Sequence, residues 1–177
     1  MQMVISDTDI IAAILRDTDK GFRMLVAAYS QRIYWHIRRT VITHHDAEDG
    51  LQETFVRAFR SIENLRKDES LKSWLYRIAT NEALRIVEKR ERQHTSLEDA
   101  FNLQSDPFVN YADAEGIELK KAIQTLPRQQ RLVFNLRYYD NLSYDEIAAI
   151  LDTTVQSARA NYHNAKERII KYMQTIY

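Results

Sequence analysis

The sequence predicts an all-α protein made of two small helical domains, a helical bundle and a helix-turn-helix domain, joined by a flexible linker. Only 3 Gly and 2 Pro occur among 177 residues, which favours long helices over tight turns. Apolar residues make up 45% of the chain and recur at helical spacing in several segments. One stretch, 93–118, has six acidic residues and no Lys or Arg. We therefore expect a first domain over 1–92, an acidic linker over 93–112 and a second domain over 113–177.

Composition narrows the class of protein further. The chain has no Cys, so it has neither a disulfide framework nor a thiolate metal site. No apolar run is long enough to span a membrane, and the first ten residues lack the basic start and apolar core of a signal peptide. These features indicate a soluble, cytoplasmic protein. The net charge is zero, but 70–92 and 119–177 are basic, with +3 and +4, and flank the acidic connector.

The first domain begins with two expected helices. A short one over 9–16 has the large apolar residues Ile10, Ile11, Ile14 and Leu15, and a longer one over 20–40 has a strong apolar stripe at helical spacing. The stripe consists of Phe22, Leu25, Val26, Tyr29, Ile33 and Ile37. This longer helix is expected to form part of the core.

A third helix is expected over 47–62, with Asp46 as its N-cap. Its apolar side consists of Leu51, Phe55, Ala58, Phe59 and Ile62. Its other side consists of Glu48, Asp49, Gln52, Glu53 and Arg57. From the pattern alone, this second side is an ordinary solvated surface.

A fourth helix is expected to start after Ser70, as its cap, and to run to about Arg92. Its apolar stripe contains Leu71, Trp74, Leu75, Ile78 and Val87. Off that stripe lie Lys72, Tyr76, Arg77, Asn81, Arg85, Lys89 and Arg90. Basic residues among aromatic ones suit a single-stranded nucleic acid, because cations follow phosphates and aromatic rings stack on bases. A buried Trp74 with basic side chains extended around it explains the spacing equally well.

The second domain is expected to begin with a helix from about residue 112 and to continue with a helix that has Pro127 in its first turn. Ser143 and Glu146 form a capping box that starts a short helix. Thr153 and Gln156 repeat this pattern before a longer helix. The turn between them has Asp152 where Gly is common, and Asp tolerates left-handed backbone angles better than most residues.

A short helix, a tight turn and a longer helix make a helix-turn-helix, which puts the start of its second helix in the DNA major groove. The residues at that place are Thr154, Gln156, Ser157, Arg159 and Ala160. Gln and Arg make bidentate contacts with bases. An ordinary helical hairpin inside an all-α domain is the alternative.

Two segments resemble one family. DAEDGLQETFVRAFRSI at 46–62, followed by LKSWLYRIATNEALRIVEKR at 71–90, resembles region 2 of the extracytoplasmic-function (ECF) sigma factors of bacterial RNA polymerase. LPRQQRLVFNLRYYDNLSYDEIAAILDTTVQSARANYHNAKERI, at 126–169, resembles their region 4. The resemblance covers roughly 20–90 and 115–171, in the family's order.

The resemblance implies a role for each surface. The acidic side of the third helix would bind the clamp helices of the polymerase β′ subunit through Asp46, Glu48, Asp49, Gln52, Glu53 and Arg57. The following loop and helix would open the minus-ten promoter element and hold a flipped base through Asn64, Arg66, Lys67, Ser70, Lys72, Trp74, Arg77, Asn81 and Arg85. The helix-turn-helix would read the minus-thirty-five element through Thr154, Gln156, Ser157, Arg159 and Ala160, with phosphate contacts from Arg128, Arg137, Lys166 and Arg168.

The resemblance also implies two further partners, the polymerase β flap and an anti-sigma factor, which is often membrane-anchored. It implies too that the acidic linker of this chain is threaded through the polymerase near the RNA exit path. One departure is that Asn161 and Asn164 stand where the family commonly has Arg or Lys, which weakens phosphate neutralisation. Two other classes of function stay open. These are a stand-alone dimeric helix-turn-helix regulator and a protein-interaction module that has lost DNA binding. The resemblance implies that the protein is not an enzyme, and we expect no cofactor. We also expect no metal, on the interpretation that no carboxylate stands at a helical spacing that completes a site with His36, His44 or His45.

Overall fold

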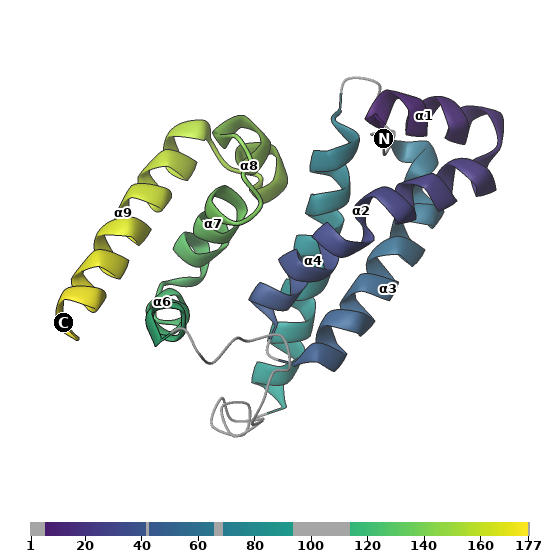
Figure 1. Cartoon of the computed structure of the whole chain (residues 1–177). Helices are drawn as coiled ribbons and strands as arrows, with labels where there is room; N and C mark the ends of the chain where they lie inside the picture. Colours follow the sequence, from purple (N-terminus) through teal and green to yellow (C-terminus); the bar gives the residue numbers. More distant parts are fainter. Residues whose placement is uncertain (1–5, 42, 66–68, 94–113, 177) are drawn as a thin grey trace. The chain divides into compact units, whose positions relative to one another are not determined.

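A computed structural model describes residues 6–41, 43–65, 69–93 and 114–176. In these ranges the regular elements are helices and no strand occurs, which confirms the predicted all-α class. The chain divides into two compact units, Met1–Thr95 and Ser96–Tyr177 (Figure 1). The expected linker lies outside the described residues except for Gln93. No helix among the described residues is both long and apolar enough to cross a membrane.

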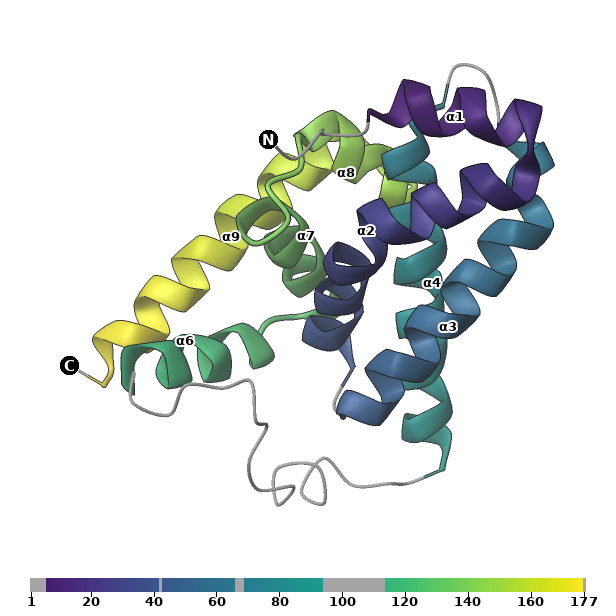
Figure 2. The same ribbon diagram turned by 45° about the vertical axis from the view of Figure 1, so that its right-hand side comes forward.

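Unit 1 is a helical bundle. It consists of α1 (Asp7–Arg16), α2 (Thr18–Thr40), α3 (His44–Ser61), the 3-10 turn η1 (Ile62–Asn64) and α4 (Leu71–Arg92). Helices α2, α3 and α4 pack against one another, and α1 packs mainly on α2 (Figures 1 and 2). Leu25, Ile33 and Ile37 from α2 and Leu75 and Ala79 from α4 are fully buried between them.

The connection between α1 and α2 is sharp. Asp17 ends α1 and also caps α2, because its side chain accepts a hydrogen bond from the Lys20 amide at 3.1 Å. Gly21 lies so close to α1 that a Cβ atom there would stand 2.3 Å from the backbone nitrogen of Ile14. Only glycine permits this approach, so α1 is fixed against the start of α2.

Two sequence predictions in unit 1 were wrong. Helix α3 begins at His44 with Thr43 as its N-cap, whereas the sequence pattern favoured Asp46. The Thr43 hydroxyl accepts from the Asp46 amide at 3.0 Å, which leaves Asp46 inside the first turn. Tyr76 was expected off the apolar stripe of α4, but it is buried. Its burial follows from the packing of α4, which contacts α1, α2 and α3.

Unit 2 consists of α6 (Ala114–Gln124), α7 (Arg128–Tyr138), α8 (Tyr144–Leu151) and α9 (Val155–Gln174). Helix α9 packs against the other three helices. The core of unit 2 contains Ala122, Ile123, Leu126, Phe134, Ala165 and Ile169.

The expected helix-turn-helix forms from α8 and α9. The predicted capping box of Ser143 and Glu146 is present. Asp152 ends α8 with φ 50° and ψ 54°, the left-handed conformation that the sequence suggested Asp would tolerate. The cap of α9 was predicted one residue too early, since Thr154, not Thr153, accepts from the Ser157 amide at 3.1 Å. Pro127 precedes α7 as its N-cap residue instead of lying in the first turn.

Candidate functional site

The exposed side of α3 has an acidic start. The side chains of Glu48 and Asp49 are 57% and 62% exposed, and Gln52 is exposed one turn further along. His44 and His45 lie one turn before the two acids, with Nε2 to carboxylate distances of 3.1 Å and 3.5 Å. The expectation that no carboxylate stands at a helical spacing from these histidines was therefore wrong, because Glu48 and Asp49 each lie four residues after one of them. This side of α3 therefore exposes carboxylates to solvent, with imidazoles beside them.

Asp46 belongs to the packing of unit 1 instead of this exposed side. Its side chain is only 12% exposed and forms a two-pronged ion pair with Arg90 of α4, at 2.8 Å and 2.9 Å. Burial opposes ionisation of the carboxyl, but hydrogen bonds from Arg90 and Thr43 and the charge of Arg90 outweigh it, so the pKa of Asp46 lies below its ordinary value. Asp46 thus joins the start of α3 to the end of α4.

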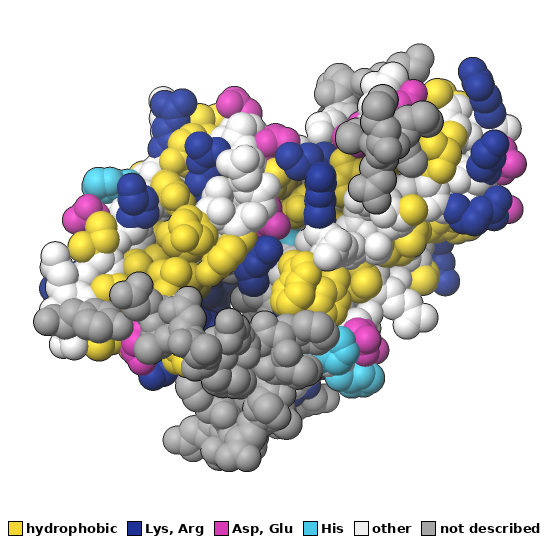
Figure 3. Space-filling model, viewed as in Figure 1, with side chains coloured by type: hydrophobic (Ala, Val, Ile, Leu, Met, Phe, Trp, Pro, Cys, Tyr) yellow, Lys and Arg dark blue, Asp and Glu magenta, His cyan; other side chains and the backbone are white. Residues whose placement is uncertain are grey.

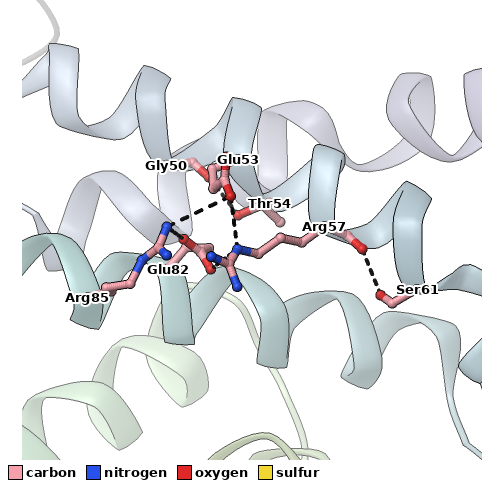
Figure 4. Close-up of polar contacts among 7 residues, drawn as sticks. All are labelled: Gly50, Glu53, Thr54, Arg57, Ser61, Glu82 and Arg85. Carbon is pink, nitrogen blue, oxygen red and sulfur yellow. Dashed lines mark hydrogen bonds and ion pairs between the residues drawn. The ribbon is translucent and has the colours of Figure 1, made fainter.

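Glu53 and Arg57 on α3 form a second link to α4 (Figure 4). Arg57 Nε lies 3.0 Å from a Glu53 oxygen and 2.6 Å from a Glu82 oxygen. Arg85 of α4 lies 2.6 Å from the other Glu82 oxygen and 3.9 Å from Glu53. We call these four residues the charge quartet. It joins two residues assigned to polymerase with one assigned to the minus-ten element.

The minus-ten candidates on α4 do not share one environment. Ser70 is the N-cap, and its hydroxyl accepts from the Ser73 amide at 3.3 Å. Trp74 is 7% exposed, so its ring belongs to the core and is not presented for stacking on a base. Arg77 is paired with Glu69, and Asn81 is exposed.

The remaining minus-ten candidates are Asn64, Arg66, Lys67 and Lys72, before α4 and in its first turn. Asn64 is exposed at the end of η1, and Lys72 is half-buried in the first turn of α4. Arg66 and Lys67 lie outside the described residues. The structure therefore brings Asn81 and Arg85 to the exposed surface of α4, one turn apart.

The start of α9 presents a polar surface. Gln156, Arg159 and Ala160 are exposed on its first two turns. Ser157 is half-buried and is held by Asn161, whose amide nitrogen donates to the Ser157 carbonyl at 3.0 Å and lies 3.3 Å from its hydroxyl. The candidate phosphate contacts Arg128, Lys166 and Arg168 are also exposed. Figure 3 shows Lys and Arg side chains interleaved with apolar ones over the α8–α9 part of one face.

An aromatic side chain links two of the basic residues. Tyr144, the first residue of α8, has the guanidinium carbons of Arg137 and Arg159 at 5.1 Å and 5.5 Å from its ring centre. Both distances allow a cation–π interaction. Arg137 also donates to the Leu142 carbonyl at 2.8 Å, so it is held against the turn before α8.

Comparison with known proteins decides the family. The family model "Sigma-70 region 2" matches residues 25–93, and "Sigma-70, region 4" matches 117–169. The RNA polymerase sigma-H factor of Pseudomonas aeruginosa strain PAO1 is 30% identical in an alignment of 183 positions that covers 96% of this chain and 95% of that protein. The ECF RNA polymerase sigma-E factor of Salmonella typhimurium strain LT2 is 29% identical over 99% of this chain and 98% of its own. The chain belongs to the ECF family of RNA polymerase sigma factors.

This sigma factor directs RNA polymerase to promoters, and its family are not enzymes. A stand-alone regulator would leave the region 2 match in unit 1 without explanation. Two solved structures share the fold. CnrH, in complex with the cytosolic domain of CnrY, has a TM-score of 0.73 at 21% identity and covers 96% of this chain and 97% of its own. The sigma factor RpoE of Bartonella quintana, in complex with the anti-sigma factor NepR, has a TM-score of 0.72 at 22% identity, covering 88% and 98%.

The sequence interpretation missed two residues that hold site residues of this sigma factor in place. Glu82 belongs to the charge quartet, and Tyr144 contacts Arg137 and Arg159. Glu82 and Arg85 stand three residues apart on a predicted helix, a spacing typical of ion pairs, and this spacing was an available signal. Tyr144 gave no such signal, because its two arginine partners come from other helices. Among the described residues no group of three or more His, Cys, Asp or Glu is placed to hold a metal ion. His36 is buried and its Nε2 lies 2.8 Å from the Thr80 hydroxyl.

Proposed function

We propose that this sigma factor binds the clamp helices of the polymerase β′ subunit through the exposed side of α3, with Asp49, Gln52 and Glu53 at its centre. The observation that supports this most is the exposure of the acids Glu48 and Asp49 at the start of α3, where the family resemblance places the polymerase contact. The pairing of Asp46 with Arg90 removes Asp46 from this set, since that carboxylate is satisfied inside unit 1.

The two promoter elements are assigned to separate units. In this proposal, Asn81 and Arg85 on α4, together with the loop before it, act on the minus-ten element. The exposed start of α9 reads the minus-thirty-five element, with Gln156 and Arg159 at the base edges. The exposed cations nearby fit phosphate contacts, which supply affinity without sequence preference.

An anti-sigma factor is the proposed regulator. Two structural relatives of this fold were solved in complex with one partner each, the cytosolic domain of CnrY and the anti-sigma factor NepR. The sigma factor is proposed to act in the cytoplasm, where RNA polymerase is found.

The test is a binding measurement with purified bacterial core polymerase and a charge reversal in the acidic side of α3. Asp49→Arg is preferred to a change at Glu53, because Glu53 contacts two arginines of the charge quartet, whereas Asp49 is exposed and is paired with His45 of its own helix. We expect Asp49→Arg to lower the affinity for polymerase at least tenfold.

The matched control is Glu63→Arg, the same charge reversal in η1, about 20 Å further along the chain direction of α3 at 1.5 Å per helical residue. The control should bind within twofold of the unsubstituted chain. An equal loss in both variants would reflect net charge alone and would remove the assignment of this side of α3.

A further inference from the structure

The charge quartet connects the two proposed surfaces of unit 1. Glu53 and Arg57 come from α3, Glu82 and Arg85 come from α4, and the four ion pairs among them close a ring (Figure 4). The two negative and two positive charges cancel. In the free chain, therefore, the cation of Arg85 faces carboxylates and adds little to the attraction of nucleic acid.

The two carboxylates of the quartet are held differently. Glu82 is 3% exposed and lies 2.6 Å from each arginine, so it is fixed by burial and by both partners. The Glu53 side chain is 40% exposed, lies 3.0 Å from Arg57 and reaches Arg85 only at 3.9 Å. Because a buried carboxylate that loses its partners is costly, Glu53 is the member that an outside cation can draw away.

We propose that the charge quartet couples polymerase binding to promoter binding. A cationic group of the polymerase that pairs with Glu53 removes one negative charge, and the remaining three residues then have a net charge of +1. Arg85 keeps its 2.6 Å pair with Glu82, but the excess positive charge of the three residues then attracts a phosphate of the opened promoter strand to its exposed guanidinium. This inference rests on the proposed function, since it takes Glu53 as facing polymerase and Arg85 as facing DNA.

If binding of polymerase to Glu53 strengthens DNA binding, then removing the charge of Glu53 should strengthen DNA binding in the absence of polymerase. Glu53→Gln keeps the shape of the side chain and removes its charge, so it imitates the engaged state in the free chain. The probe is a fluorescein-labelled single-stranded oligonucleotide of 20 nucleotides and mixed sequence, titrated with the full chain between 50 and 200 mM salt. We expect about fivefold tighter binding at 50 mM salt, and a plot of log affinity against log salt that is steeper by about 0.7, the value for one further phosphate contact on a single strand.

Two comparisons separate this coupling from a general charge effect. Glu91→Gln removes the same charge from an exposed position on α4 outside the quartet, and it should tighten binding less than twofold. The double variant Glu53→Gln/Arg85→Ala should bind no more tightly than Arg85→Ala alone. Circular dichroism of each variant confirms that the helices are retained.

The coupling would be overturned if Glu91→Gln raised the oligonucleotide affinity as much as Glu53→Gln does. It would also be overturned if Glu53→Gln still raised this affinity when Arg85 is replaced by Ala. Binding of core polymerase by the unsubstituted chain is measured in parallel. If that chain binds polymerase but Glu53→Gln does not change oligonucleotide affinity, the coupling alone is refuted. If the chain does not bind polymerase, the proposed function fails, and with it the assignment of Glu53 on which the coupling depends.

Discussion

Replacing Arg90 by Met tests the ion pair that joins the start of α3 to the end of α4. Breaking a fully buried pair costs about 3–5 kcal/mol, and an exposed pair contributes about 0.2–1 kcal/mol. This pair lies between those limits, because the Asp46 and Arg90 side chains are 12% and 28% exposed and the two nitrogen–oxygen distances are 2.8 and 2.9 Å. Asp46 also keeps its place at the N-terminus of α3 beside Thr43. We therefore expect Arg90→Met to lower the free energy of unfolding of unit 1 by about 2 kcal/mol at pH 7.

The assay is urea unfolding followed by tryptophan fluorescence. Both tryptophans of the chain, Trp35 and Trp74, lie in unit 1, so the signal reports this unit alone. At about 1–3 kcal/mol per molar urea, the expected loss moves the midpoint by about 1 M. A double-mutant cycle with Asp46→Asn isolates the interaction between the two residues.

The pH dependence gives an independent check. The pKa of Asp46 is lowered in the folded chain, so its ion pair contributes stability that is fully present above the unfolded pKa of about 3.9 and is lost as the pH falls through the lower folded pKa. The difference in free energy of unfolding between the unsubstituted chain and Arg90→Met should therefore be constant from pH 7 to about pH 5 and shrink toward pH 3. A difference that is the same at pH 7 and pH 3, or a coupling energy near zero in the cycle, would refute the reasoning.

Three further predictions concern unit 2. Arg159→Ala should weaken binding to a matched minus-thirty-five duplex by about 1–3 kcal/mol if it reads a base, and an equal loss on every sequence would make it a phosphate contact. Tyr144→Leu should lower the preference for the matched duplex two- to fivefold, because Arg159 loses the ring it lies over, whereas Tyr144→Phe keeps the ring and the preference. Equal losses in the Leu and Phe variants would indicate that the hydroxyl is what matters. Thr154→Ala should destabilise unit 2 by about 1 kcal/mol in thermal unfolding followed by circular dichroism, while Thr153→Ala should cost much less, and the reverse order would mean that the cap is misassigned.

The sequence predicted the helices well because each has a long apolar stripe and a local start signal. Ser70 and Ser143 were assigned correctly as caps, and Ser143 has in Glu146 the second member of a capping box. The predictions failed by one to three residues where two residues compete. Thr153 and Thr154 both suit a cap, and which one serves depends on where the turn after Asp152 leaves the backbone. A local pattern does not contain that information.

The spacing of apolar residues within a helix does not predict which polar side chains of different helices meet. Asp46 and Arg90 are 44 positions apart, and nothing in either segment indicates that they meet. Trp74 illustrates the same limit, because its spacing suited a core residue and a stacking platform equally. The packing of α4 against three other helices resolves it in favour of the core.

The charge quartet also changes how substitutions in unit 1 should be interpreted. The family resemblance implies that Glu53 and Arg57 bind polymerase and that Arg85 binds DNA, as if the two surfaces were independent. The structure instead joins all three in one ring of ion pairs, in which the buried Glu82 pairs with both arginines and Glu53 pairs with the same two. Residues that share a partner do not act additively, and interaction energies of about 0.5–3 kcal/mol are typical of such contacts. With the proposed site assignments, we expect a single change at Arg57 or Glu53 to alter polymerase binding, DNA binding and stability together. Comparison with a paired substitution that keeps the charge of the quartet balanced, such as Glu53→Gln/Arg85→Ala, is then needed to assign an effect to one surface.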